Sequence, residues 1–272
     1  MKTPSITVFT KPWPELPVAQ LADLVASLGF NGIELPIRPG FQVEPENMKD
    51  ELPKAASIFR NRGLEIQSVA TDLTTEAIEA CAEAGVRILR TMLSLAPGLS
   101  YFENVDTFRQ QCEGLIAATA GSGVSIGLQN HCDRFASSAV SIMQAIESLG
   151  SDHVSAVLDL GHTGLDGELE DIAIDVCWPR LTMVNLKNSV RERTTVEDGV
   201  QQWRRKWVPG KDGITNWDKG IEELGKRDYT GPICITAEYA DDNFKPYSGD
   251  AILPYVKEDM DYLKHLIGKY YA

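Results

Sequence analysis

VSIGLQNHCDRFASSAVSIMQAIESLGSDHVSAVLDL, residues 124–160, holds two β-rich runs on either side of a helical stretch. The first run spans 124–130, a helix is expected near 136–149, and the second run spans 154–160. Both runs are largely apolar on both faces, as in strands that are covered by helices on either side. The stretch therefore predicts a strand, a helix and a second, parallel strand.

The same pattern recurs along the whole chain. Further strands are expected at 5–9, 31–35, 64–70, 86–92, 181–187 and 232–239, and further helices at 16–29, 74–85 and near 47–62, 104–121, 168–176 and 252–268. Eight such units match the size of a single (β/α)8 TIM barrel of the α/β class, and no linker rich in proline, glycine or serine divides them. We predict one domain over residues 1–272. An open, doubly wound sheet is the alternative, but no G-x-G-x-x-G follows the first strand, so no nucleotide cofactor is expected.

Composition narrows the possible partners. The 26 Lys and Arg residues against 39 Asp and Glu residues give a net charge of −13, which repels nucleic acid and anionic membrane surfaces. No partner of either kind is expected, and neutral or cationic small molecules fit better. The five cysteines show no CxxC spacing, which argues against a disulfide framework or a zinc knot and favours the cytoplasm. No export signal or membrane-spanning segment is expected.

Polar residues stand where several predicted strands end. In a barrel, the carboxyl ends of the strands face the catalytic mouth, so Asp159 and Glu238, which end separate strands, are expected to converge. Convergent carboxylates raise one another's pKa unless they share a cation or a proton. Gln129 and Asn185 end two further strands and offer neutral oxygen ligands beside them. An oxygen-rich set of this kind favours Mg, Mn or Ca.

Several of these strand ends resemble a known family. The stretches GFNGIEL (29–35), LQNH (128–131), VLDLGHT (157–163), VNLKNSVR (184–191) and ITAEY (235–239), with VPGKDGITNWDKGIEELGKRDYTGPICI (208–235), are similar to xylose isomerase-like TIM barrels. This sugar isomerase and epimerase superfamily includes keto-sugar epimerases, hydroxypyruvate isomerase and inosose dehydratase. The resemblance spans nearly the whole chain and is most specific from 124 to 239.

The resemblance implies a metal site with two altered ligands. Members of the family typically bind one divalent cation through Glu, Asp, His and Glu on strands five to eight, which correspond here to Gln129, Asp159, Asn185 and Glu238. Affinity for a transition metal is expected to fall, although Mn, Mg or Ca can still be held by two carboxylates and two amides. Gln129 cannot act as a base, so the family's two-base epimerisation is not expected. Glu238 is predicted as a single catalytic base, with His162 as an acid or as a group that binds the substrate oxygens.

Six further residues are candidates for substrate binding, each with an ordinary structural alternative. Lys187 and Arg191 follow the seventh strand, where two cations can neutralise an anionic substrate or an enediolate. Trp13 offers an indole face on which a sugar ring can stack. The six candidates are Glu34, Asn130, His131, Lys187, Arg191 and Trp13.

The segment from 189 to 213 is long for a loop of a barrel, which is typical of functional or mobile segments. Trp203 and Trp207 are four residues apart, and this spacing predicts a helical lid with an apolar face. That face would meet the barrel mouth or a neighbouring subunit of a homo-oligomer. Plain structural packing is the alternative.

Three functions follow from these features. The first is a sugar isomerase or epimerase that takes a proton from the carbon next to a carbonyl of a keto-sugar or related polyol. The second is a metal-free sugar-binding or accessory protein that has lost catalysis, and the third is a lyase or dehydratase acting on a keto-sugar or inosose. An abasic-site endonuclease fits poorly, since four histidines and an acidic chain supply too few ligands for several metals.

Overall fold

The computed structural model describes residues 3–271. Eight parallel strands form a closed barrel, in which β1 pairs with β2 on one side and with β10 on the other. This arrangement confirms the predicted (β/α)8 barrel. The strands are β1 (Ile6–Phe9), β2 (Gly32–Pro36), β3 (Glu65–Ala70), β4 (Ile88–Met92), β5 (Ser125–Gln129), β6 (Val154–Asp159), β7 (Leu181–Leu186) and β10 (Ile233–Ile235).

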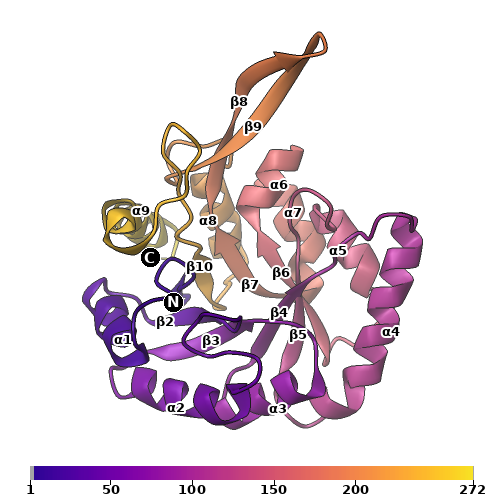
Figure 1. Ribbon diagram of the computed structural model, residues 1–272, viewed down its shortest axis with the longest axis vertical. Helices are drawn as coiled ribbons and strands as arrows, with labels where there is room; N and C mark the ends of the chain where they lie inside the picture. Colours follow the sequence, from indigo (N-terminus) through magenta and orange to yellow (C-terminus); the bar gives the residue numbers. More distant parts are fainter. Residues whose placement is uncertain (1–2, 272) are drawn as a thin grey trace.

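Helices surround the barrel (Figure 1). Their apolar faces pack on the sheet, and side-chain caps fix where several of them begin; Ser100, for example, forms a reciprocal capping box with Glu103 at the start of α4. The outer helices are α1 (Val18–Ser27), α2 (Met48–Arg60), α3 (Thr75–Ala84), α4 (Tyr101–Thr119), α5 (Ala139–Ile146), α7 (Glu170–Cys177), α8 (Trp217–Lys226) and α9 (Leu253–Tyr270). Short 3-10 turns occupy Trp178–Arg180 and Gly249–Ile252. Among residues 3–271, no helix combines the length and apolar character needed to cross a membrane.

Apolar side chains form two buried clusters. The larger one lies between the sheet and the helices, and a smaller one packs together residues of β1, β3, β4, β6, β7 and β10. Each fully buried large side chain contributes about 1.5–3 kcal/mol to stability. The smaller cluster consists of Phe9, Ala70, Ile88, Val157, Met183 and Cys234.

The chain turns into a short helix directly after β6. This helix, α6 (Leu160–Asp166), replaces the last residue of the predicted strand and was not expected from the sequence. The Asp159 side chain caps it by accepting the backbone N–H groups of Gly161 and His162. A helix of seven residues is too short to reveal itself by periodicity, so the strand prediction ran one residue too far.

A β-hairpin stands where the helical lid was expected. It consists of β8 (Asn188–Glu197) and β9 (Val200–Val208), which pair antiparallel and project away from the barrel (Figure 1). The helix prediction was wrong because residues four apart share a face of a strand as well as a face of a helix. Asp198 and Gly199 both have positive φ, as a tight hairpin turn requires.

Candidate active site

A small cavity lies at the carboxyl ends of the barrel strands. Its volume is about 120 Å³, and most of its lining side chains are polar. Gln129, Asp159, Asn185 and Glu238, which come from four different strands or their ends, all border it, so the four meet around one hollow. The full lining is Phe9, Lys11, Arg38, Arg90, Met92, Gln129, His131, Asp159, Asn185, Lys187, Thr236 and Glu238.

Asp159 is held rigidly at the end of β6. Its Oδ1 accepts hydrogen bonds from the N–H groups of Gly161 (3.0 Å) and His162 (3.2 Å), and its Oδ2 accepts one from Nε2 of Gln129 (2.8 Å). Asn130 braces its backbone, because the Asn130 amide pairs with both the N–H (2.8 Å) and the carbonyl (3.0 Å) of Asp159. Asn130 therefore supports the site from behind and does not border the cavity. Burial raises the pKa of Asp159 to about 6, although Lys187 opposes this shift.

Glu238 forms ion pairs with two lysines. Its Oε2 lies 2.5 Å from Nζ of Lys187 and its Oε1 lies 2.5 Å from Nζ of Lys11. Burial alone would raise the pKa of Glu238, but the two ammonium groups outweigh it and hold this pKa below its usual range. Ala237 has a φ of +51°, a conformation that non-glycine residues rarely adopt and that tends to occur at functional sites.

Lys187 is a buried cation among several partners. Its Nζ lies 4.0 Å from Oδ2 of Asp159 as well as against Glu238, and it sits 4.4 Å from the ring centre of Trp207. Burial would lower its pKa, but the two carboxylates raise it, so the side chain is an ammonium ion at neutral pH. Gly161 makes room for this residue, since a Cβ there would come within 2.7 Å of the Lys187 carbonyl oxygen.

A second buried ion pair lies beside the first. Nε of Arg90 donates to Oε1 of Glu34 at 2.5 Å, and its Nη1 donates to Oε1 of Gln129. Ser68 also donates to Oε1 of Glu34. Glu34 is completely buried and does not line the cavity. Glu34, predicted to bind substrate, therefore does not reach the cavity, but it fixes the orientation of Arg90, which lines it.

The two histidine rings pack against each other at a tilt beside Lys187. The ring centres of His131 and His162 are 4.1 Å apart, and Nε2 of His162 lies 3.3 Å from Nζ of Lys187. Burial, reinforced by the charge of Lys187, lowers the pKa of His131 to about 4 and that of His162 well below its usual value. Both rings are therefore neutral at pH 7. Of the two, His131 borders the cavity, whereas the side chain of His162 is completely buried.

Two predicted substrate-binding residues lie away from the cavity. Trp13 is only 2% exposed and packs in the core, where its Nε1 donates to the Gly249 carbonyl at 3.2 Å. Arg191, on β8, donates to the Leu165 carbonyl at 2.7 Å. The rule that residues at the carboxyl ends of barrel strands face the mouth uses sequence position alone and does not specify side-chain direction. Here the indole of Trp13 lies in the core, and the guanidinium of Arg191 contacts α6.

The donor set at the mouth does not fit a divalent cation. The Gln129 oxygen accepts from Arg90 and its nitrogen donates to Asp159, so this amide offers no free ligand atom toward the carboxylates. The ammonium group of Lys187 already pairs with Glu238 and would repel a metal ion there. In the cavity lining, Oδ1 of Asn185 is buried and has no hydrogen-bond partner among the described residues. One open acceptor beside an ammonium ion does not make a coordination shell.

A second possible ligand group consists of His131, Cys132 and His162. Their ligand atoms lie within 4.8 Å of one another. However, the Lys187 ammonium lies 3.3 Å from Nε2 of His162 and would repel a metal ion there. Burial also raises the pKa of the Cys132 thiol to about 12, which disfavours the thiolate that binds metal. These three residues therefore fit a metal ion poorly as well.

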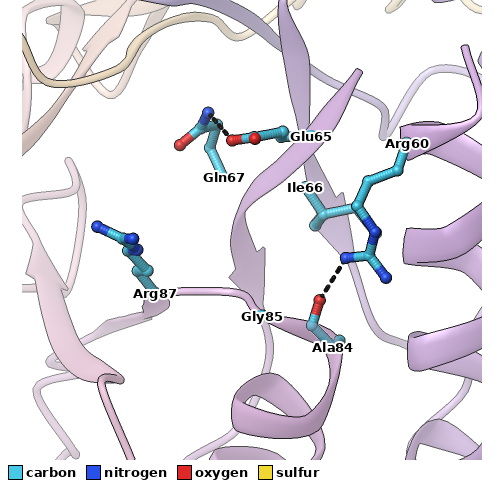
Figure 2. A pocket seen from close by; sticks show the side chains of 7 residues that line it. All are labelled: Arg60, Glu65, Ile66, Gln67, Ala84, Gly85 and Arg87. Carbon is cyan, nitrogen blue, oxygen red and sulfur yellow. Dashed lines mark hydrogen bonds between the residues drawn. The ribbon is translucent and has the colours of Figure 1, made fainter. Parts of the chain in front are cut away.

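The opposite end of the barrel holds a separate surface cavity (Figure 2). There, Arg60 donates to the Ala84 carbonyl at 2.9 Å and Gln67 donates to Glu65 at 3.0 Å, while the Arg87 side chain is exposed. Glu65 begins β3 and Arg87 precedes β4, so this is the amino-terminal face. Polar groups on that face of a barrel mainly serve stability.

Comparison with known proteins agrees with this fold. Residues 22–266 match the family described as xylose isomerase-like TIM barrel, and the chain therefore belongs to that family. No curated protein matches the sequence. Among solved structures, the IOLI protein with a bound zinc atom is similar at a TM-score of 0.75 and 15% identity, covering 98% of this chain and 99% of that one.

Two further solved structures resemble the chain over nearly its full length. The 3-keto-D-glucoside 4-epimerase YcjR from E. coli has a TM-score of 0.71 and 12% identity, with coverage of 97% of this chain and 100% of that one. The probable 3-DHS dehydratase AsbF from Bacillus anthracis has a TM-score of 0.70 and 16% identity, with coverage of 97% and 99%. At these identities the likeness shows the fold alone.

Proposed function

We propose that the protein is an isomerase or epimerase of keto-sugars or related polyols, which takes a proton from the carbon next to a carbonyl. The observation that carries this proposal is the buried ammonium group of Lys187 beside two carboxylates at the barrel mouth. Loss of such a proton creates an enediolate, whose negative charge requires a fixed positive group in a dry site. The fold shared with a sugar epimerase supports the substrate class.

Glu238 is the proposed base. Its side chain is 19% exposed to the cavity, whereas that of Asp159 is fully buried, so a substrate reaches Glu238 first. In the proposed step, the Glu238 carboxylate takes the proton, the C–H electron pair forms a carbon–carbon double bond, and the carbonyl oxygen takes the negative charge. The ammonium group of Lys187, which was paired with the Glu238 carboxylate, then pairs with the substrate oxyanion, because Glu238 becomes neutral as the substrate oxygen becomes charged.

A single base has a stereochemical consequence. Gln129 cannot accept a proton on the opposite face, since its amide is not basic and both of its ends are already hydrogen-bonded. Glu238 returns the proton to the face from which it came. This favours transfer between neighbouring carbons, which is isomerisation, over inversion at one carbon. The predicted acid, His162, is fully buried and does not line the cavity, so in this proposal its neutral ring positions the Lys187 ammonium group, which borders the cavity.

The test follows hydrogen exchange from solvent. Wild-type protein incubated with a panel of keto-sugars in deuterated water should incorporate deuterium next to the carbonyl. Glu238→Gln should slow this exchange by about 10²–10⁴-fold, whereas Glu79→Gln, the same change at an exposed position on α3, should leave it unaltered. Exchange at the wild-type rate in Glu238→Gln, or none with any sugar in the wild type, would refute the proposal.

A binding protein without catalysis is the second candidate. It is favoured by the two lysines on Glu238, which lower the pKa of this carboxyl and make it a weak base in the resting protein. Sugars that raise the melting temperature but exchange no hydrogen would indicate this function. Analysis of the products in the same experiment would identify a lyase or dehydratase, since the product of such an enzyme lacks a hydroxyl group of the substrate.

A further inference from the structure

We infer that the ligand of the barrel mouth carries a carboxylate and that Arg38 binds it, so that the substrates are small sugar acids. This inference rests on the proposed function and names its substrate class. It is carried by one guanidinium group in the cavity that has no anion of its own.

Arg38 lies two residues beyond β2, in a loop that is closed on itself by a β-bridge between Ile37 and Val43. Its side chain is half-buried and lines the cavity. Among residues 3–271, no carboxylate lies within ion-pair distance of it. The neighbouring cations differ in this respect, since Lys11 and Lys187 both pair with Glu238. A half-buried guanidinium group without a partner calls for an anion from outside the chain.

The charges around the mouth give the same answer. Four cationic side chains surround the mouth, and three of them lie within ion-pair distance of a carboxylate, which leaves Arg38 without such a partner among the described residues. A carboxylate on the ligand supplies this partner with a single negative charge, whereas a phosphate carries about −1.5 to −2 at pH 7. The cations are Lys11, Arg38, Arg90 and Lys187, and the carboxylates are Glu34, Asp159 and Glu238.

The local charge differs from that of the whole chain. The net charge of −13 suggested neutral or cationic small partners, but a ligand inside the mouth meets the nearby cations at a much shorter range than the acidic surface. Burial and the nearby charge of Arg90 lower the pKa of Arg38, which is the direction expected for a cation without its anion.

The shape of the groups also suits a small sugar acid. The planar guanidinium group of arginine binds a carboxylate through two parallel hydrogen bonds. The volume of about 120 Å³ is well below the 300–1,000 Å³ typical of sites for drug-sized ligands. Such a cavity suits a compact chain of a few carbons with its carboxylate at the Arg38 end and its carbonyl near Lys187.

The test uses three ligands that differ only in one terminal group: D-fructose, D-fructuronate and a fructose phosphate, with glycerate as a shorter acid. Calorimetric titration of the wild type should show the tightest binding for the carboxylates. Arg38→Gln should weaken carboxylate binding by about 10- to 100-fold and change D-fructose binding less than about 2-fold. Arg87→Gln, which removes the same charge at the opposite end of the barrel, should leave all affinities unchanged.

Each other outcome overturns the inference. Carboxylates that bind no better than D-fructose, tighter binding of the phosphate, or equal losses in Arg38→Gln and Arg87→Gln would each remove Arg38 as the anion site. If D-fructose still exchanges deuterium in those cases, the proposed function stands and only the sugar-acid specificity fails. Absence of binding by every ligand, together with absence of exchange, would contradict both.

Discussion

The Nζ of Lys187 lies 2.5 Å from Oε2 of Glu238 and 4.0 Å from Oδ2 of Asp159. The family resemblance assigns both carboxylates to a metal ion, yet here a side chain of the protein supplies the positive charge between them. Gln129 agrees with this arrangement, because its neutral amide donates to Asp159 where a third carboxylate would add repulsion. A tethered ammonium ion, unlike a metal, cannot be removed by a chelator.

Metal response should therefore separate this protein from a metal enzyme. Neither EDTA nor Mn²⁺ should change the wild-type melting temperature. In Gln129→Glu/Asn185→His/Lys187→Met the ammonium group is gone and two stronger ligands are present, so Mn²⁺ at 100 times its Kd should add about 2.7 kcal/mol of stability. The double variant that retains Lys187 is the control and should respond less. Strong Mn²⁺ stabilisation of the wild type would contradict the prediction.

Asp159 should make stability depend on pH. Its pKa of about 6, against a usual value of 3.8, means that the folded protein holds this proton more tightly than the unfolded chain. The resulting stability is full below about pH 4 and is lost as the pH rises through 6, by about 3 kcal/mol in total. Urea unfolding from pH 4 to 7 should show this loss in the wild type relative to Asp159→Asn, which carries no titrating proton.

The comparison with Asp159→Asn also removes the contributions of other carboxyl groups. The lowered pKa of Glu238 acts in the opposite direction, since it adds stability above about pH 4.3 that is lost on further acidification. That contribution is shared by both proteins and cancels to first order. Stability curves that run parallel over the whole range would show that Asp159 titrates normally.

Much of the fold is predictable from the sequence because the barrel strands are buried on both faces. Their short apolar runs stand out between amphipathic helices, and all eight were recognised. The prediction missed α8 although its apolar residues are spaced three and four apart, and it extended the eighth strand four residues beyond Ile235. Other errors occurred where the pattern is ambiguous. Trp203 and Trp207 share a face in either kind of element, and α6 is too short to show a helical period.

The candidate site was only partly predictable. The strand-end rule brought Gln129, Asp159, Asn185 and Glu238 to one cavity, since it depends on topology alone. The rule predicts which residues lie near the cavity but not which of them form ion pairs. The contact of Lys187 with Glu238 depends on side-chain conformations, which cannot be inferred from sequence spacing. Arg38 was missed because it lies three residues beyond the predicted end of its strand at 35, and extending the rule by three residues would have found it.

The close approach of α6 to β7 should make Gly161 intolerant of a side chain. A Cβ at this position would lie 2.7 Å from the Lys187 carbonyl oxygen, which is rigid backbone. Gly161→Ala should destabilise the protein by about 1–3 kcal/mol and displace Lys187. Gly114→Ala is the control, because this helical glycine has no atom within 4 Å of the added Cβ, and it should stabilise by about 0.5–1 kcal/mol. Equal effects in urea unfolding would refute the contact.

The two tryptophans of β9 should differ in their importance, although they belong to one strand. The ring of Trp207 lies 4.4 Å from Nζ of Lys187 and 5.4 Å from the ring of His162, whereas Trp203 is 56% exposed farther along the hairpin. Trp207→Leu removes the cation–π contact of a partly buried ring with the buried Lys187 and should cost about 1–2 kcal/mol. Trp203→Leu should change stability by less than about 0.5 kcal/mol. Similar losses in both variants would mean that the hairpin contributes through its strand pairing and not through the contact of Trp207 with the site.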